Sequence, residues 1–149
     1  MQRNVRSRAV RRAACLLAVC VGTFLTACGR DSPSIPAGRV IGVNERDFHI
    51  AVDTVAIAAG DYVLRIHNAG PDQHELIVVP DHRGGLALRG DGFTTNEEAI
   101  QSSEPGAVDP QHPGATTYLR LHLKPGRYVL FCNMAGHFMA GMHTDLVVS

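Results

Sequence analysis

A thiol, an imidazole and a thioether follow one another near the C-terminus of this 149-residue chain. Cys132, His137 and Met142 are spaced C-x4-H-x4-M. A second imidazole, His74, stands just before an apolar segment at residues 76–79. Two histidines and a cysteine with a weak, distant methionine are the donors of a mononuclear blue-copper site. These four residues are therefore predicted to bind one copper ion; the alternative is a structural cysteine, a surface histidine and a core methionine.

The elements that must position these donors have the pattern of β-strands. Tyr62, Leu64 and Ile66 alternate with other residues, and three leucines alternate in the same way within residues 119–123. Further strand-like segments lie at residues 48–52, 55–57, 76–79, 127–131 and 144–148. Short strands separated by Gly- and Pro-containing turns predict an all-β fold, an antiparallel sandwich of about seven to eight strands. His74 would then come from one strand end and the other donors from a loop between two later strands.

One stretch, residues 81–116, is long for a loop in a small domain. Thr94 followed three positions later by Glu97 has the spacing of a helix start. We expect one short helix there, with irregular chain on either side.

The first 27 residues have the pattern of a secretory signal. Five arginines precede an apolar stretch at residues 13–25, which is shorter than the ~20 residues of a membrane span. Leu-Thr-Ala-Cys at residues 25–28 resembles the processing site of bacterial lipoproteins, which implies that Cys28 carries lipid. An ordinary signal followed by a coincidental cysteine is the alternative. With lipid on Cys28, we expect the protein on the extracytoplasmic side of a bacterial membrane, in the periplasm or at the cell surface.

The rest of the chain divides into a tether and one domain. Residues 28–38 are small and polar with two prolines and are predicted to form a flexible tether. Residues 39–149 are long enough for one domain with a single core. Removal of the signal takes away five arginines and no acidic residue, which leaves nine basic against 14 acidic residues and a net charge of about −5. That balance argues against binding to nucleic acid, which requires clustered lysine and arginine.

The cysteines support a metal site. Cys15 and Cys20 belong to the signal and Cys28 would carry lipid, so Cys132 is the one thiol left. In an oxidising compartment most cysteines are paired, and a bond to a metal would account for a lone one.

The domain at residues 39–149 resembles the cupredoxin family of small type 1 copper proteins. Members share an Asn-x-Gly turn before the first histidine ligand, matched here at residues 68–70, and a Pro-Gly-x-Tyr segment before the cysteine, matched at residues 125–128. The long spacings of the ligand loop are closer to sulfocyanin-like members than to plastocyanin. One departure is Glu75, which stands where several members have an Asn or Ser that braces the cysteine loop.

The resemblance implies a Greek-key β-sandwich with a single type 1 copper. His74 and His137 would supply the imidazoles, Cys132 the thiolate and Met142 the axial thioether. It also implies that the second histidine is the electron port and that apolar neighbours dock partners. Phe138 and Met139 are the candidates for docking, or else they cap the core.

The expected function is that of a monomeric electron carrier, exchanging electrons with redox proteins and catalysing no reaction of its own. A protein that binds and passes on copper without a redox role would use the same ligands. Copper nitrite reductases and multicopper oxidases need a second copper site and a second domain, and a binuclear purple-copper site needs two cysteines in the loop. None of these features is found in the sequence.

Overall fold

The computed structural model of the protein describes residues 37–81 and 85–149. The predicted signal, the lipid on Cys28 and most of the predicted tether lie outside these residues. Among the described residues, no helix is long and apolar enough to cross a membrane.

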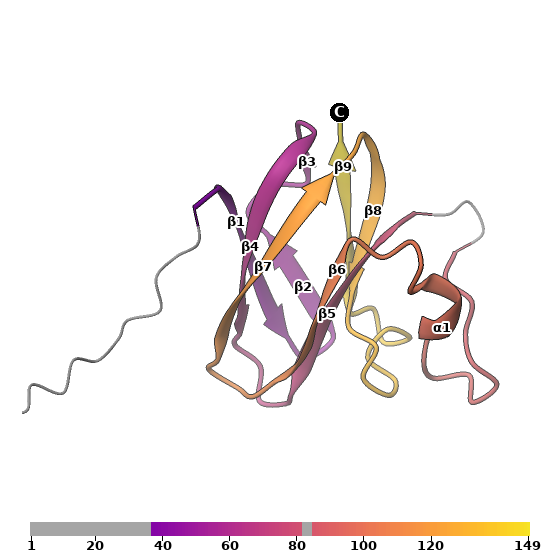
Figure 1. Cartoon of the computed structure of the whole chain (residues 1–149). Helices are drawn as coiled ribbons and strands as arrows, with labels where there is room; N and C mark the ends of the chain where they lie inside the picture. The colour runs from indigo at the N-terminus through magenta and orange to yellow at the C-terminus, as the bar shows by residue number, and fades with distance from the viewer. Residues whose placement is uncertain (1–36, 82–84) are drawn as a thin grey trace, which may run out of the picture. The chain divides into compact units, whose positions relative to one another are not determined.

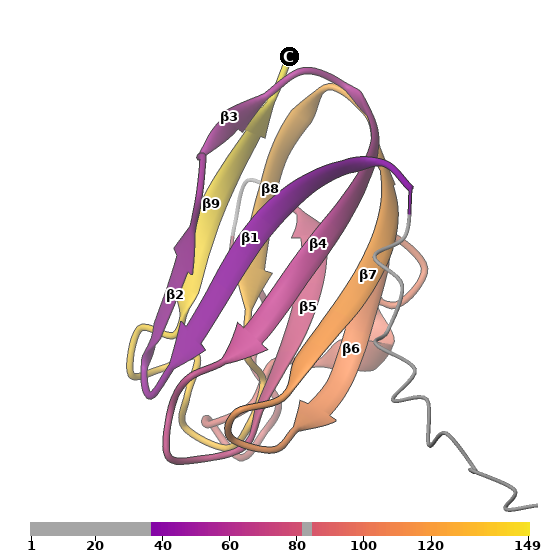
Figure 2. The same cartoon turned by 90° about the vertical axis from the view of Figure 1, so that its left-hand side faces the viewer.

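Two facing β-sheets make up the domain (Figures 1 and 2). The first contains, from edge to edge, β2 (His49–Val52), β1 (Arg39–Arg46), β4 (Gly60–Asn68) and β7 (Thr116–Leu123). The second contains β3 (Ala56–Ile57), β9 (His143–Val148), β8 (Gly126–Phe131), β5 (His74–Pro80) and β6 (Gly106–Gln111). One short helix, α1 (Glu97–Ile100), lies in the long connection between β5 and β6. The predicted all-β sandwich with one short helix is confirmed.

The core follows from strand alternation. Tyr62, Leu64 and Ile66 of β4 are buried between the sheets, as predicted. β5 is buried on both faces. Its even-numbered side chains, Leu76 and Val78, join the main core, and the odd-numbered ones join a second cluster with Ile100 of α1. The segment around α1 therefore covers the outer face of this sheet, which explains the unbroken apolar run of residues 76–79.

Three details differ from expectation. The sandwich is not purely antiparallel, because β1 pairs with β4 and β3 with β9 in parallel. Residues 106–111, expected to be irregular, form the edge strand β6; they lack clear alternation, and Pro110 is tolerated because the strand lies at an edge. The helix begins after Asn96, whose side chain makes no cap, and the Thr94 hydroxyl donates to Asp91 and not to the helix.

Three connections meet at the lower end of the sandwich in Figure 2. They are the β1–β2 turn, the β4–β5 loop and the β8–β9 loop. His74 is the first residue of β5, and Cys132 directly follows β8. Because β5 and β8 are neighbours in one sheet, these two donors are brought together by strand pairing.

Candidate metal site

The side chains of His74, Cys132 and His137 converge at this end of the sandwich. One donor atom from each lies within 4.8 Å of those of the other two. The sulfur of Cys132 is 3.5 Å from Nδ1 of His137, and the two imidazole centres are 5.2 Å apart. The structure thus brings together three of the four predicted ligands, from two separate parts of the chain, in an arrangement able to hold a single metal ion.

His74 has one ring nitrogen engaged and one free. Its Nε2 lies 3.1 Å from Oδ1 of Asp47. An ionised carboxylate only accepts hydrogen bonds, so Nε2 carries the proton and Nδ1 has the lone pair. This Nδ1 is buried and has no hydrogen-bond partner within the described part of the chain. A buried polar atom without a partner costs free energy, and a metal ion would supply the partner.

The predicted Asn-x-Gly turn shapes the loop that leads to His74. The buried Asn68 amide donates to the carbonyl groups of Asp72 and Gln111, and its oxygen accepts from the Gly70 N–H. Gly70 leaves room for the site: a Cβ there would lie 2.6 Å from Nε2 of His74. The turn therefore allows the backbone to approach the histidine closely.

The loop between β8 and β9 is closed on itself by backbone hydrogen bonds. The Cys132 N–H donates to the Met142 carbonyl, and the Met142 N–H donates to the His137 carbonyl. Gly136 and Gly141 have φ of +82° and +100°, where residues with a side chain are disfavoured. These two glycines make tight turns directly before His137 and Met142.

Met142 is fully buried in the main core, beside Cys132 in the same cluster. Its backbone makes hydrogen bonds with the backbones of Cys132 and His137, the other two predicted ligands in this loop. This placement fits an axial ligand and also fits a core methionine, so its ligand role stays a prediction.

Burial determines the protonation of the donors. It lowers the pKa of His74, with repulsion from His137 acting in the same direction and the Asp47 carboxylate opposing it. It raises the pKa of Cys132 to about 11, although backbone N–H groups of Glu75 and Met134 bond to the sulfur and act the other way. The site therefore offers a neutral imidazole and a protonated thiol, and a metal ion must displace the thiol proton when it binds.

Glu75, the departure from the family pattern, does brace the cysteine loop. Its carboxylate accepts a hydrogen bond from the backbone N–H of Asn133, the residue after Cys132. Burial, followed by repulsion from Glu97, raises the pKa of Glu75 to about 7. The side chain of Asn133 in turn donates to Glu97 and to the Thr95 carbonyl. The long connection around α1 is thereby tied to the ligand loop.

Three residues near the site are not among the sequence predictions. Asp47 contacts His74, and Phe48 contacts His137 with ring centres 5.5 Å apart. Glu45 is completely buried, neither of its oxygens has a partner among the described residues, and burial with repulsion from Glu75 raises its pKa to about 7. Glu45 alternates with the apolar Ile41 and Val43 along β1. This alternation in the sequence would have predicted that the Glu45 side chain faces the interior.

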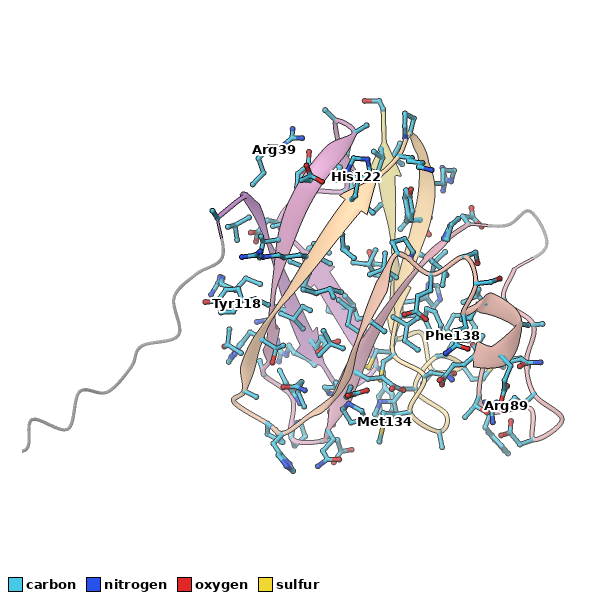
Figure 3. The ribbon with its side chains drawn as sticks, in the orientation of Figure 1. Arg39, Arg89, Tyr118, His122, Met134 and Phe138 are labelled. Atoms are coloured by element: carbon cyan, nitrogen blue, oxygen red, sulfur yellow. The ribbon has the colours of Figure 1, made fainter. Side chains whose placement is uncertain are left out.

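The two histidines differ in exposure, since His74 is buried and His137 is partly exposed, as the implied role of His137 as electron port requires. The predicted docking residues, Phe138 and Met139, also differ in how far they are exposed. Phe138 packs against Phe131 in the second cluster, on the α1 side in Figure 3, so its contacts are those of a core cap. Met139 is 55% exposed and Phe48 is 50% exposed. An apolar surface beside His137 thus includes Phe48, which lies far from the ligand loop in sequence.

Comparison with solved structures identifies the fold. Auracyanin from the photosynthetic bacterium Roseiflexus castenholzii is 16% identical, with a TM-score of 0.55 over 76% of this chain and 99% of auracyanin. Auracyanin A, described as a "blue" copper protein from Chloroflexus aurantiacus, is 18% identical, with a TM-score of 0.55 over 74% of this chain and 98% of its own. Rusticyanin from Thiobacillus ferrooxidans is 15% identical, with a TM-score of 0.57 over 76% and 79% respectively. Neither a family model nor a curated protein sequence matches the chain. The domain therefore has the cupredoxin fold, as predicted.

Proposed function

We propose that this chain is a mononuclear type 1 copper protein that carries electrons. The observation that carries the proposal is the buried Nδ1 of His74, which has no partner among the described residues and lies beside the Cys132 thiol and the His137 imidazole. Two imidazoles and a thiolate suit copper, and copper held by them would take up and release one electron. Auracyanin A, described as a "blue" copper protein and similar in fold, supports this choice of metal.

The protein would keep the donors in one geometry during electron exchange. His74 is held by its strand and by Asp47, and Cys132 is held by hydrogen bonds from two neighbouring backbone segments. A rigid donor set limits the rearrangement that accompanies each change of charge. Of the four predicted donors only His137 is partly exposed, and we propose that redox partners dock there, over Phe48 and Met139.

We further propose that the domain works outside the cytoplasm, tethered to a membrane by lipid on Cys28, as a carrier rather than an enzyme. Cys132, the one cysteine of the described residues, is buried, and a bond to copper would protect such a thiol in an oxidising compartment.

Titration of the purified protein with Cu(II), followed by visible absorption and electron paramagnetic resonance, tests the function. We expect an intense thiolate-to-copper band with a stoichiometry of one. Cys132→Ser should abolish the band and leave the fold intact, because a hydroxyl replaces the soft thiolate. Copper binding without a reversible reduction potential would favour the alternative, a protein that only passes on the metal. Absence of the band in the wild type would refute the proposal.

A further inference from the structure

The two-residue turn between β1 and β2 contacts both imidazoles of the site. Arg46 pairs with His49, so the turn consists of Asp47 and Phe48 alone. Asp47 accepts a hydrogen bond from His74, and Phe48 presents its ring to His137 at an angle of 78°. These two contacts come from adjacent residues, and neither residue belongs to the proposed ligand set.

The backbone of this turn is unusual. Phe48 has a φ of +61° and is the one non-glycine residue with a positive φ in the described part of the chain. Two-residue hairpin turns favour Asn-Gly or Asp-Gly, because glycine adopts positive φ without strain. A bulky residue in this conformation is disfavoured, and such strained residues cluster at functional sites. Phe48 is also half exposed, so burial in the core does not account for it.

Asp47 is held in place from a second direction. Its Oδ1 lies 3.4 Å from the Asp72 N–H as well as 3.1 Å from Nε2 of His74. A Cβ at Gly70 would lie 2.8 Å from this oxygen, so the chain passes closely over the pair. The carboxylate is 27% exposed and the imidazole is buried, which makes the carboxylate the outer member of the pair.

We propose that the Asp47–Phe48 turn positions both histidines of the site, an inference that rests on the proposed copper function. Asp47 holds the proton of His74 on Nε2 and so keeps Nδ1 free for the metal. Phe48 restrains the ring of the more exposed His137 by an edge contact. A ligand histidine that donates its other N–H to a carboxylate is fixed in tautomer and orientation, and loss of such a partner weakens metal binding by about 10–100-fold.

The tautomer of His74 in the metal-free protein provides the first test, by 15N NMR of the histidine rings. We expect the Nε2–H form in wild type, a mixture of forms in Asp47→Ala, and recovery of the Nε2–H form in Asp47→Asn, whose amide oxygen still accepts. Asp61→Ala is a matched control, because it removes a carboxylate that lies 2.7 Å from His122 at the opposite end of the sandwich (Figure 3). An unchanged His74 tautomer in Asp47→Ala would overturn the role of Asp47.

Binding of Cu(II) provides the second test. Asp47→Ala should raise the Cu(II) dissociation constant by about 10–100-fold. Phe48→Gly should also raise it, both variants should change the copper spectrum, and Asp61→Ala should change neither. Glycine suits the backbone at position 48, so Phe48→Gly should fold with equal or higher stability to denaturant. Stable Phe48→Gly with wild-type affinity and spectrum would overturn the role of Phe48.

If wild type itself fails to bind Cu(II), the proposed function fails, whereas the metal-free tautomers still decide the role of Asp47.

Discussion

The imidazoles of His74 and His137 lie 5.2 Å apart at an interplanar angle of 61°, yet one is buried and the other is partly exposed. The difference arises from their positions in the chain. His74 begins β5, an inner strand with a neighbour on each side, whereas His137 lies in a loop at the end of the sandwich.

This difference predicts unequal chemical reactivity. In the metal-free protein, diethyl pyrocarbonate should modify His137 well before His74, as measured by peptide mass spectrometry over time. Copper should protect both rings, and His74→Ala and His137→Ala should each lose the site. Equal modification rates for the two histidines would contradict the proposed route through His137.

Met142 is expected to set the reduction potential more than the affinity, because a thioether is a weak and distant ligand. Met142→Leu keeps a similar apolar volume, so stability should change by less than about 1.5 kcal/mol. Its potential should rise, since the remaining softer donor set favours Cu(I). Met142→Gln introduces an oxygen donor that favours Cu(II), and its potential should fall. Cyclic voltammetry of the wild type and both variants measures the three potentials. If they coincide, Met142 is a core residue and not a ligand.

Gly70 is predicted to be intolerant of even a methyl group. Gly70→Ala places a carbon against His74 and Asp47, and overpacking of this kind costs about 1–3 kcal/mol. Urea denaturation of the metal-free protein measures the loss as a lower midpoint. Gly90→Ala is the matched control, because no atom lies within 4 Å of its Cβ position and its midpoint should not fall. Equal midpoints for the two variants would show that the loop over His74 has room to move.

The buried carboxyl of Glu45 predicts a pH-dependent stability. Its pKa is about 7 in the folded protein and near 4.5 in an unfolded chain, so the folded state binds more protons between these values. The free energy of unfolding of the metal-free protein should therefore fall as pH rises from about 4.5 to 7. Glu75, with a pKa of about 7, contributes to the same slope.

In Glu45→Gln the free energy of unfolding should fall less between pH 4.5 and about 7, by an amount of the order of 2 kcal/mol, because the amide has no charge to bury. Denaturant unfolding at a series of pH values measures the effect. A variant with the full wild-type slope would mean that Glu45 is ionised at no cost in the folded protein.

The anchor is predicted to depend on one residue. Cys28→Ala should move the protein from the membrane fraction to the soluble fraction, because it removes the predicted site of lipidation. Fractionation followed by immunoblotting measures the distribution. Complete retention of the variant on membranes would mean that the N-terminal segment anchors the chain by itself.

Much of the fold was predictable from local patterns. The alternation in β4 and β7 identifies strands whose inner residues are buried, and the apolar run of β5 identifies a strand covered on both faces. β6 was missed because its pairing with β5, rather than its own sequence, makes it a strand. The parallel pairing of β1 with β4 likewise depends on how distant segments assemble.

The sequence alone identified the candidate donors, because residue type decides which atoms can bind a soft metal, and C-x4-H-x4-M fits within one loop. The tertiary structure decided which nitrogen of His74 is free and which ring lies near solvent. The first property depends on Asp47, which lies 27 positions from the histidine that it contacts, and the second depends on the places of the two histidines in the fold. No local pattern encodes such a contact, since it exists only when the β1–β2 turn and the β4–β5 loop meet at one end of the sandwich.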